Sequence, residues 1–287
     1  MIQALIGIKL RMKSVTNIRK ITRAMEMVSL SKLNRVRAAL FAERHYFARL
    51  EPVLNDLLDG AGDVGHPLLE KRSPDGKIGL CVITSDTGLC SVYNQNIIRA
   101  SEAFAAKFKK EEVRIIAVGR EGLHHFRRLG FEITVSCPEL HGRYPGKLSE
   151  KIANDMAGIF LSKEVNEVFI AYTHFENTLR HRPRVEKFLN VERRTPASYT
   201  IDRLITEPDA RGVADELIPK YLFEKLHLIL LEAFTSEHAA RMVAMKTATD
   251  NADELMDTLT LFRNKTRQAA ITKEVIEIAS AAEAMRD

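Results

Sequence analysis

The fold is decided near the carboxyl end of the chain, by SEHAARMVAMKTATDNADEL (236–255) and LTLFRNKTRQAAITKEVIEI (259–278). Both stretches lie inside the 68 residues from Lys220 to Asp287, which contain neither glycine nor proline, the two residues that most often interrupt helices. Apolar and small residues recur there at steps of three and four, as in a coiled-coil seam. The predicted seam is Leu222, Leu226, Ile229, Ala233, Met242, Met245, Thr249, Ala252, Leu255, Leu259, Phe262, Thr266 and Ala269. At 1.5 Å per residue the segment predicts a helix of about 100 Å.

The amino-terminal segment predicts a shorter partner for this helix. Residues 8–51 contain no glycine or proline. Residues at steps of three and four form a second predicted seam, which begins just before this range: Leu5, Ile8, Met12, Val15, Ile18, Thr22, Met25, Ser29, Lys32 and Val36. Residues 1–50 carry eleven basic and two acidic residues, whereas residues 207–287 carry ten basic and fifteen acidic residues. Opposite charge suits side-by-side packing, so we expect an antiparallel coiled coil whose second helix protrudes. The Ala-rich end of that helix either lets another surface come close or simply favours helix.

The middle of the chain alternates strand and helix patterns. Twelve of the fourteen glycines lie between residues 60 and 158, which indicates a turn-rich segment. We expect strands at 78–84, 113–118, 131–135, 165–174 and 184–192, and helices at 94–110, 121–129 and 148–161. Such alternation predicts a Rossmann-like, three-layer α/β domain with a largely parallel sheet. The predicted fold class is therefore mixed α/β, in three segments: a long helix at 1–58, an α/β domain at 76–195 and a long helix at 210–287 that forms a coiled coil with the first.

Composition excludes several classes of protein. The 287 residues are 45% hydrophobic and 28% charged, which excludes disordered and collagen-like chains. Cys81, Cys90 and Cys137 are odd in number and lack CxxC spacing, so neither a disulfide framework nor a thiolate zinc site is expected. The start of the sequence lacks the pattern of a signal peptide, and no apolar run approaches the length of a bilayer span. We expect a soluble protein that reaches a membrane only through a partner.

Motifs for chemistry are weak. There is no GxxxxGK[ST] and no GxGxxG after a strand, so no bound nucleotide or other cofactor is expected; GREG (119–122) is interpreted as a strand-to-helix turn. The loop SDTGLC (85–90) is interpreted as a structural or contact loop, because no nucleophile signature surrounds Cys90. His174 and His181 are expected at the surface of a hairpin. The adjacent histidines at 124–125 point about 100° apart on a helix and do not chelate a metal together, so no metal site is expected.

Several stretches carry a resemblance to a known family. They are IK (8–9), SVTN (14–17), KITRAMEMVSLSKL (20–33), ITSDTGLCSVYNQN (83–96), EPD (207–209) and the two stretches quoted first. In this order they resemble the γ subunits of bacterial F-type, rotary ATP synthases. The resemblance implies a non-catalytic central rotor shaft, one per α3β3 hexamer, with α, β, ε and c subunits as partners. It also implies a peripheral position on the cytoplasmic face of the bacterial inner membrane, without insertion into the membrane.

Matching positions carry the family's contact residues to this chain. Arg267, Gln268 and Thr272 resemble the polar cluster that contacts a β-subunit loop, and Lys20, Arg23 and Met25 correspond to the facing segment of the first helix. Asp86 and its loop resemble a second set of β contacts. Glu207 and Asp209 fall where contacts with ε and the c ring are expected. For each residue the alternative is a purely structural role in the helices or turns.

The sequence departs from the family pattern in two places. Thr87, Ser91 and Val92 stand where the family has Arg, Gly and Gly, so a basic contact to β is lost. Arg263 replaces a tyrosine. Two other classes stay open from the residues alone. One is a coiled-coil adaptor or nucleic-acid-associated protein with an α/β head, although residues 1–40 lack the aromatic residues that often accompany basic ones in nucleic-acid binders. The other is an enzyme, which requires converging titratable groups in the middle domain.

Overall fold

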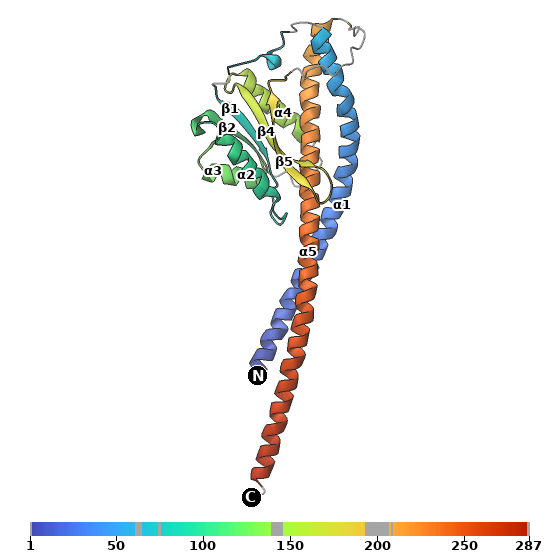
Figure 1. Cartoon of the computed structure of the whole chain (residues 1–287), viewed down its shortest axis with the longest axis vertical. Coiled ribbons are helices and arrows are strands. Elements are labelled where there is room, and N and C mark those ends of the chain that lie inside the picture. Colours follow the sequence, from blue (N-terminus) through green and yellow to red (C-terminus); the bar gives the residue numbers. More distant parts are fainter. Residues whose placement is uncertain are drawn as a thin grey trace. The chain divides into compact units, whose positions relative to one another are not determined.

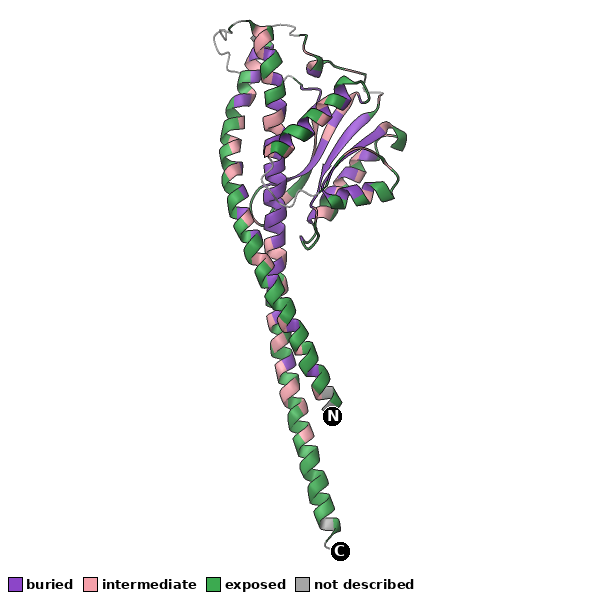
Figure 2. Cartoon of the chain, turned by 180° about the vertical axis from the view of Figure 1, so that it is seen from behind, coloured by how far each residue is buried: buried purple, intermediate pink, exposed green. Residues whose placement is uncertain are grey.

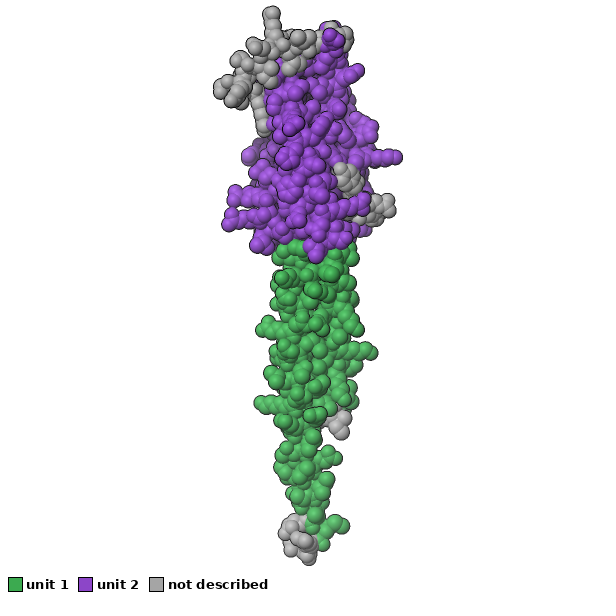
Figure 3. Space-filling view, turned by 90° about the vertical axis from the view of Figure 1, so that its right-hand side faces the viewer, with its two compact units in different colours: residues 1–29, 242–287 green, residues 30–241 purple. Residues whose placement is uncertain are grey.

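The computed structural model describes residues 2–60, 65–73, 76–138, 146–192, 207 and 209–285. The chain divides into two compact units, one of residues 1–29 with 242–287 and one of residues 30–241 (Figure 3). Two long helices, α1 (Ile2–Gly60) and α5 (Ala210–Ala284), each contribute to both units. The division therefore cuts both helices, whereas the segments expected from the sequence keep each helix whole.

In the first unit α1 and α5 form an antiparallel pair, as predicted (Figure 1). Val15 packs against Ala252 and Leu259, and all three side chains are buried. The hydroxyl groups of Thr22 and Thr249 lie 2.8 Å apart in the seam, so a buried polar pair is satisfied within it. The seam is thin, because only one row of side chains from each helix is covered.

The predicted seam is wrong at several positions. Ile18 is 53% exposed, and the neighbouring Arg19 lies on the partner side, where its Nε is 2.5 Å from Asp253 Oδ1. In α5, Leu255 is exposed and the adjacent Met256 packs on the buried cluster instead. Steps of three and of four both fit the sequence after Val15. The structure adopts the step of four here, because Arg19 pairs with α5 and Ile18 is exposed.

The carboxyl-terminal part of α5 extends beyond the start of α1, which confirms the predicted protrusion (Figure 2). Residues 271–282 of α5 are all exposed. Each helix also contains a proline, Pro52 in α1 and Pro219 in α5. Both prolines lie on exposed faces, where water can hydrogen-bond the carbonyl group that loses its N–H partner.

The second unit contains a five-stranded sheet in the order β3-β2-β1-β4-β5. The strands are β1 (Ile78–Ile83), β2 (Val113–Val118), β3 (Glu132–Cys137), β4 (Glu167–Phe175) and β5 (His181–Leu189). The helices are α2 (Tyr93–Ala105), α3 (Arg120–Arg128) and α4 (Gly146–Leu161), with short 3-10 turns at Pro67–Leu69 and Lys110–Glu112. The first four strands in this order are parallel and β5 is antiparallel to β4, which confirms the largely parallel sheet.

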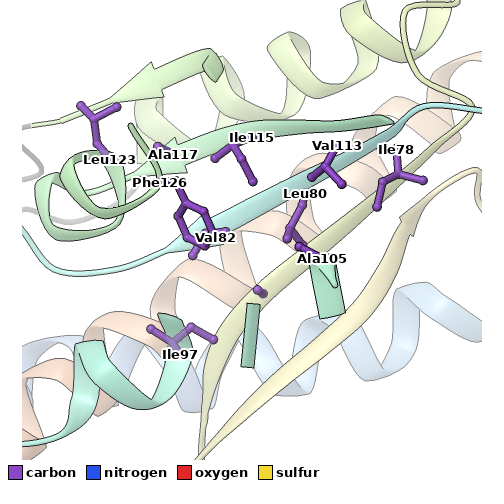
Figure 4. Packing of buried hydrophobic residues seen from close by; sticks show 11 residues of the cluster. Ile78, Leu80, Val82, Ile97, Ala105, Val113, Ile115, Ala117, Leu123 and Phe126 are labelled. Atoms are coloured by element: carbon purple, nitrogen blue, oxygen red, sulfur yellow. The ribbon is translucent and has the colours of Figure 1, made fainter. Parts of the chain in front are cut away.

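The sheet is the middle layer of three. On one face, alternate residues of β1 and β2 pack against α2 and α3 (Figure 4). The members of this cluster are Ile78, Leu80, Val82, Ile97, Ala105, Val113, Ile115, Ala117, Leu123, Phe126 and Ala171. On the other face, Gly79 lies against the side chain of Ile159 in α4. Because side chains alternate across a strand, the same strands serve both layers.

Beside α4, helix α5 passes the sheet in its most enclosed stretch. Residues 229–241 of α5 are all buried, whereas a coiled coil would bury only one side (Figure 2). Ser236 Oγ donates a hydrogen bond to the carbonyl oxygen of Thr173 in β4 (3.2 Å), and Tyr93 Oη of α2 donates to the carbonyl oxygen of Ala233 (3.1 Å). This stretch of α5 therefore forms part of the core of the α/β unit.

Candidate functional site

The first candidate site is the loop from Thr84 to Val92, at the carboxyl end of β1. In open α/β sheets, ligands bind beyond the carboxyl ends of the strands where the chain's crossover direction reverses. Here that point lies between β1 and β4, since β1 leads to β2 and β3 on one side and β3 leads back to β4 on the other. The position is therefore where a ligand of an enzyme with this sheet is expected.

At this point α5 itself binds the loop. Arg241 Nη2 donates to the carbonyl oxygen of Thr87 (2.9 Å) and to its Oγ1 (3.1 Å), and Nη1 lies 2.7 Å from Glu237 Oε1. Both members of the ion pair are buried. Burial raises the pKa of Glu237, and the Arg241 guanidinium opposes that rise. We call Arg241, Glu237 and the loop residues Thr87 and Gly88 the α5 clamp.

The hydroxyl group of Ser85 is hydrogen-bonded locally, and the thiol group of Cys90 is buried. Asn94 Nδ2 donates to Ser85 Oγ (2.7 Å), and Ser85 Oγ donates to the carbonyl oxygen of Thr87 (2.8 Å). Burial raises the pKa of the Cys90 thiol, which disfavours the reactive thiolate. These contacts favour the interpretation of residues 85–90 as a structural or contact loop over a nucleophile loop.

A second, partly buried network joins α1, β4 and α5. Glu232 Oε1 accepts hydrogen bonds from Arg44 Nη2 (2.8 Å) and Nε (3.2 Å), and Glu232 Oε2 lies 2.5 Å from His174 Nδ1. Arg44 Nη2 also donates to the carbonyl oxygen of Phe175 (2.7 Å). The network corrects the expectation for His174, which faces α5 rather than solvent. His181 is likewise half-buried, with its ring stacked on Phe175 at a centroid distance of 6.3 Å.

In the first unit, two of the three predicted contact residues of α1 line a groove of about 600 Å³. Lys20 and Arg23 line it and are exposed, whereas Met25 is half-buried. Arg23 Nη1 pairs with Glu26 Oε2 at 2.9 Å, on the same helix. Thr249, Asp250 and Asp253 of α5 line the other side of the groove.

The carboxyl-terminal trio lies apart from this groove. Arg267, Gln268 and Thr272 are exposed. Arg19 pairs with Asp253, so Arg267 lies about 20 Å further along α5 at 1.5 Å per residue. The structure therefore does not bring Lys20, Arg23 and Met25 opposite the trio, contrary to the expectation of facing segments.

The remaining predicted residues lie in the second unit. Asp86 is half-exposed, and its Oδ1 accepts a hydrogen bond from the backbone N–H of Arg120 (3.2 Å). Asp209 is exposed just before α5, and its Oδ1 accepts from the backbone N–H of Gly212 (2.6 Å), which caps the helix. Glu207 is exposed two residues earlier. Asp86 and Asp209 thus have local structural roles in addition to any contact with a partner.

Two kinds of site are not found in the part of the chain that the structure describes. Among those residues, no three His, Cys, Asp or Glu side chains are grouped so that they could hold a metal ion. In the same ranges no helix combines the length and hydrophobicity needed to cross a bilayer.

Sequence reasoning missed the polar residues that hold α5 to the sheet, namely Arg44, Glu232, Glu237 and Arg241. A seam pattern assigns such residues to the solvated side of a coiled coil. The available signal was the density of polar residues in SEHAAR (236–241), directly after an apolar run and without a polar face of helical period.

The chain is similar to known proteins over nearly its whole length. A family model described as ATP synthase matches residues 4–285. The ATP synthase gamma chain of Roseiflexus castenholzii is 40% identical over 286 residues, covering 98% of each chain. That of Protochlamydia amoebophila is 35% identical over 281 residues, covering 97% of this chain and 98% of the relative.

Solved structures share the fold. A chain of the Euglena gracilis mitochondrial ATP synthase superposes with a TM-score of 0.67 at 15% identity, covering 99% of this chain and 95% of that one. A chain of the central stalk and c ring of the Tetrahymena thermophila mitochondrial ATP synthase gives 0.62 at 22% identity, covering 79% and 99%. At these identities the likeness is one of fold.

Ser91 and Val92, which stand where the family resemblance implies glycine, are predicted to respond oppositely to substitution by glycine. Ser91 has φ +54°, a conformation that costs a non-glycine residue about 1–2 kcal/mol, whereas Val92 has φ −85°. We expect Ser91→Gly to raise the free energy of unfolding by about 0.5–1 kcal/mol, and Val92→Gly to lower it by a similar amount because glycine gains more entropy on unfolding. Urea denaturation of the full chain measures both. Equal effects of the two substitutions would contradict this account.

Removing the cation of the α5 clamp is predicted to make stability depend on pH. In Arg241→Met the raised pKa of Glu237 is no longer opposed, so the folded state holds the Glu237 proton more tightly than the unfolded state. Stability is then retained below the carboxyl group's ordinary pKa and falls as the pH rises through the raised value. We expect a loss of about 3–5 kcal/mol at pH 8, as for other broken buried pairs, and a smaller loss at pH 5.

The matched control is the double variant Arg241→Met/Glu237→Gln, which removes the Glu237 carboxyl group that titrates in the single variant. Its destabilisation relative to the wild-type chain should be the same at pH 5 and pH 8 by urea denaturation. A pH-independent loss in the single variant would show that Glu237 is not charged at neutral pH in the folded chain.

Proposed function

Because this chain belongs to the family of ATP synthase γ chains, we propose that it is the central rotor shaft of a bacterial F-type ATP synthase. The observation that supports the role most strongly is the family match over residues 4–285, together with 35–40% identity to named γ chains over nearly their full length. In this role the shaft couples ion flow through a membrane ring of c subunits to the conformational cycle of the catalytic β subunits, and so to ATP synthesis or hydrolysis.

The proposal includes partners and location. One copy of the chain turns inside each α3β3 hexamer, with ε and the c ring at its foot, peripheral to the cytoplasmic face of the membrane. The chain itself is non-catalytic and binds no cofactor or nucleic acid. The hydroxyl and thiol of the loop after β1 support this, since Ser85 is hydrogen-bonded within the loop and Cys90 is held as a thiol. We also propose the three-segment organisation 1–58, 76–195 and 210–287.

The structure suggests how the chain carries torque. Rotation applied to the α/β unit reaches α5 through the α5 clamp and through the network of Glu232, where short hydrogen bonds join the loop after β1, β4 and α1 to one helix. Because α5 continues unbroken from Ala210 to Ala284, there is no loop along it that could absorb the twist. A continuous hydrogen-bonded helix is stiffer than a chain with Gly or loop hinges.

The carried-over contact residues remain proposals. We propose that Arg267, Gln268 and Thr272 contact the β subunit, and that Lys20, Arg23 and Met25 contact it at a second level about 20 Å away along the shaft. We propose Asp86 and its loop as a third β contact, and Glu207 and Asp209 as contacts with ε and the c ring. The exposure of Lys20, Arg23 and the trio supports this, because exposed side chains are available to a partner.

The proposed role is tested by reconstitution. Purified α and β subunits of the same organism are mixed with this chain, and ATP hydrolysis is followed as a function of ATP concentration. We expect a 3:3:1 complex on size exclusion and cooperative hydrolysis that α and β lack without the chain. A chain that does not join α and β, or that instead elutes with nucleic acid in a salt-sensitive complex, would favour the adaptor class and overturn the proposal.

The trio gives a sharper test, because its side chains are exposed and can be removed without loss of fold. We expect Arg267→Ala/Gln268→Ala to change the free energy of unfolding by less than about 0.5 kcal/mol. Hydrolysis by the reconstituted complex should fall about tenfold or more, since hydrogen bonds to charged groups are worth about 1.5–3 kcal/mol each.

The matched control is Glu274→Ala/Glu277→Ala, which removes two exposed charged side chains from the next turns of the same helix. It should leave hydrolysis near the wild-type rate. A similar loss in both double variants would indicate a general effect of surface charge on the helix rather than a contact made by Arg267 and Gln268.

A further inference from the structure

Two acidic side chains face each other between α1 and α5 in the α/β unit. Glu43 of α1 and Glu224 of α5 are both half-buried, and their carboxyl groups are hydrogen-bonded to each other. The second carboxyl oxygen of Glu43, Oε1, is buried and has no hydrogen-bond partner. We call Glu43 and Glu224 the carboxyl pair. It is separate from the α5 clamp and from the network of Glu232.

The hydrogen bond within the carboxyl pair requires a proton. An ionised carboxylate only accepts hydrogen bonds, so one of the two groups must be protonated in order to donate to the other. Two ionised carboxylates in the same place would repel each other, and burial would penalise both charges. The contact between α1 and α5 at this point therefore depends on a proton that exposed glutamates lose well below neutral pH.

No cation compensates the carboxyl pair in the part of the chain that the structure describes. Neither carboxyl group forms an ion pair with a described Lys, Arg or His. Arg44, the next residue of α1, is turned to Glu232 and to the carbonyl oxygen of Phe175 in β4. On the α4 side of α5, His227 Nδ1 lies 3.0 Å from Ser149 Oγ, and burial lowers the pKa of this histidine, which keeps it neutral.

The two lysines nearest to Glu224 along α5 are also directed elsewhere. Lys225 reaches β5, where its Nζ donates to the carbonyl oxygen of Lys187 (3.2 Å) and lies 4.0 Å from Glu186 Oε1. Lys220, one turn before Glu224, is exposed. The carboxyl pair is thus stabilised by its own proton and by no neighbouring charge.

These surroundings set the pH at which the proton is lost. Burial, followed by the charge and the hydrogen bond of Glu224, raises the pKa of Glu43 to about 7. The folded state therefore holds this proton more tightly than the unfolded chain does. The resulting stabilisation is complete below the ordinary pKa of a glutamate and is lost as the pH rises through about 7.

The carboxyl pair lies in a stretch where α1 is attached to α5 (Figure 1). Phe47, one turn after Glu43, packs against Tyr221, with ring centroids 5.3 Å apart. Arg44 reaches Glu232 from the same turn of α1. Repulsion between the two carboxylates would act directly beside both of these contacts.

We propose that the carboxyl pair is a pH-sensitive switch in the contact between α1 and α5. The two helices are held together here while the pair shares one proton, and this stretch of α1 loosens from α5 when the proton passes to water. The inference goes beyond the proposed rotor role, because it concerns a contact inside the chain and holds whether or not the chain turns in a complex. In a rotor, the consequence is a pair of helices that twists more easily in alkaline than in acidic surroundings.

The first test follows the unfolding of the full chain by urea at pH 6 and pH 8. We expect the unfolding equilibrium constant of the wild-type chain to rise about threefold to tenfold more between these pH values than that of Glu43→Gln. Glutamine has nearly the shape of a protonated glutamate, and its amide donates a hydrogen bond to Glu224 at both pH values. The reciprocal variant Glu224→Gln should lose most of the pH dependence as well.

The matched control is Glu216→Gln, which removes an exposed carboxyl group from the same helix, two turns before Glu224. Its stability should depend on pH as that of the wild-type chain does. If Glu43→Gln and Glu224→Gln also keep the wild-type pH dependence, the carboxyl pair does not share a proton in the folded chain and the proposal is wrong.

A second test measures the separation of the helices directly. Cys81, Cys90 and Cys137 are buried, so spin labels go to the new thiols of Ala48→Cys/Glu216→Cys, at exposed positions of α1 and α5. Double electron–electron resonance on the full chain should give a broader distribution of distances at pH 8 than at pH 6. Adding Glu43→Gln should give the narrow distribution at both pH values. A distribution that is the same at both pH values without Glu43→Gln would overturn the proposal.

Discussion

The structure depends on the pairing of Arg241 with Glu237 inside the α/β unit. A buried ion that lacks a partner costs several kcal/mol, so a buried guanidinium fixes the position of every acceptor around it. The acceptors of Arg241 lie on two elements that are far apart in sequence. One is Thr87, through its backbone and side chain, and the other is the carboxylate of Glu237, one helical turn before Arg241. The loop after β1 and helix α5 are thereby held in one geometry. The position that binds ligands in many α/β enzymes is occupied here by the protein's own helix.

The charges in α5 also explain why an α/β sheet and a coiled coil share one helix. Residues 229–241 of the helix are all buried, and their polar groups bond to several elements of the unit: Glu232 to α1 and β4, Ser236 to β4 and Arg241 to the loop after β1. A helix with only apolar side chains would pack equally well at several rotations about its own axis. Hydrogen bonds in defined directions select one rotation, which a rotor requires because its angular position carries information.

The sequence was sufficient for the elements and their order, because breaker-free stretches and alternation of strand and helix are local signals. It was sufficient for the protrusion of α5 as well, since that follows from the lengths of two segments. It failed where a contact with a residue far away in the sequence decides which way a side chain faces. Ile18 and Arg19 both fit a seam of threes and fours, and in the structure it is Arg19 that pairs with Asp253 of α5. His174 was expected at the surface because a hairpin is usually solvated, and Glu232 from a distant helix covers it. Contacts between residues that are far apart in the sequence cannot be read from any single stretch of it.

Residues 271–282 of α5 are exposed. Their side chains therefore contribute little to the free energy of folding, and substitutions there are free of the packing constraints that act on residues 229–241. Sequence change along this tip and sequence change in the α/β unit can proceed independently. Residues 271–282 can therefore change in sequence with little effect on how the chain folds.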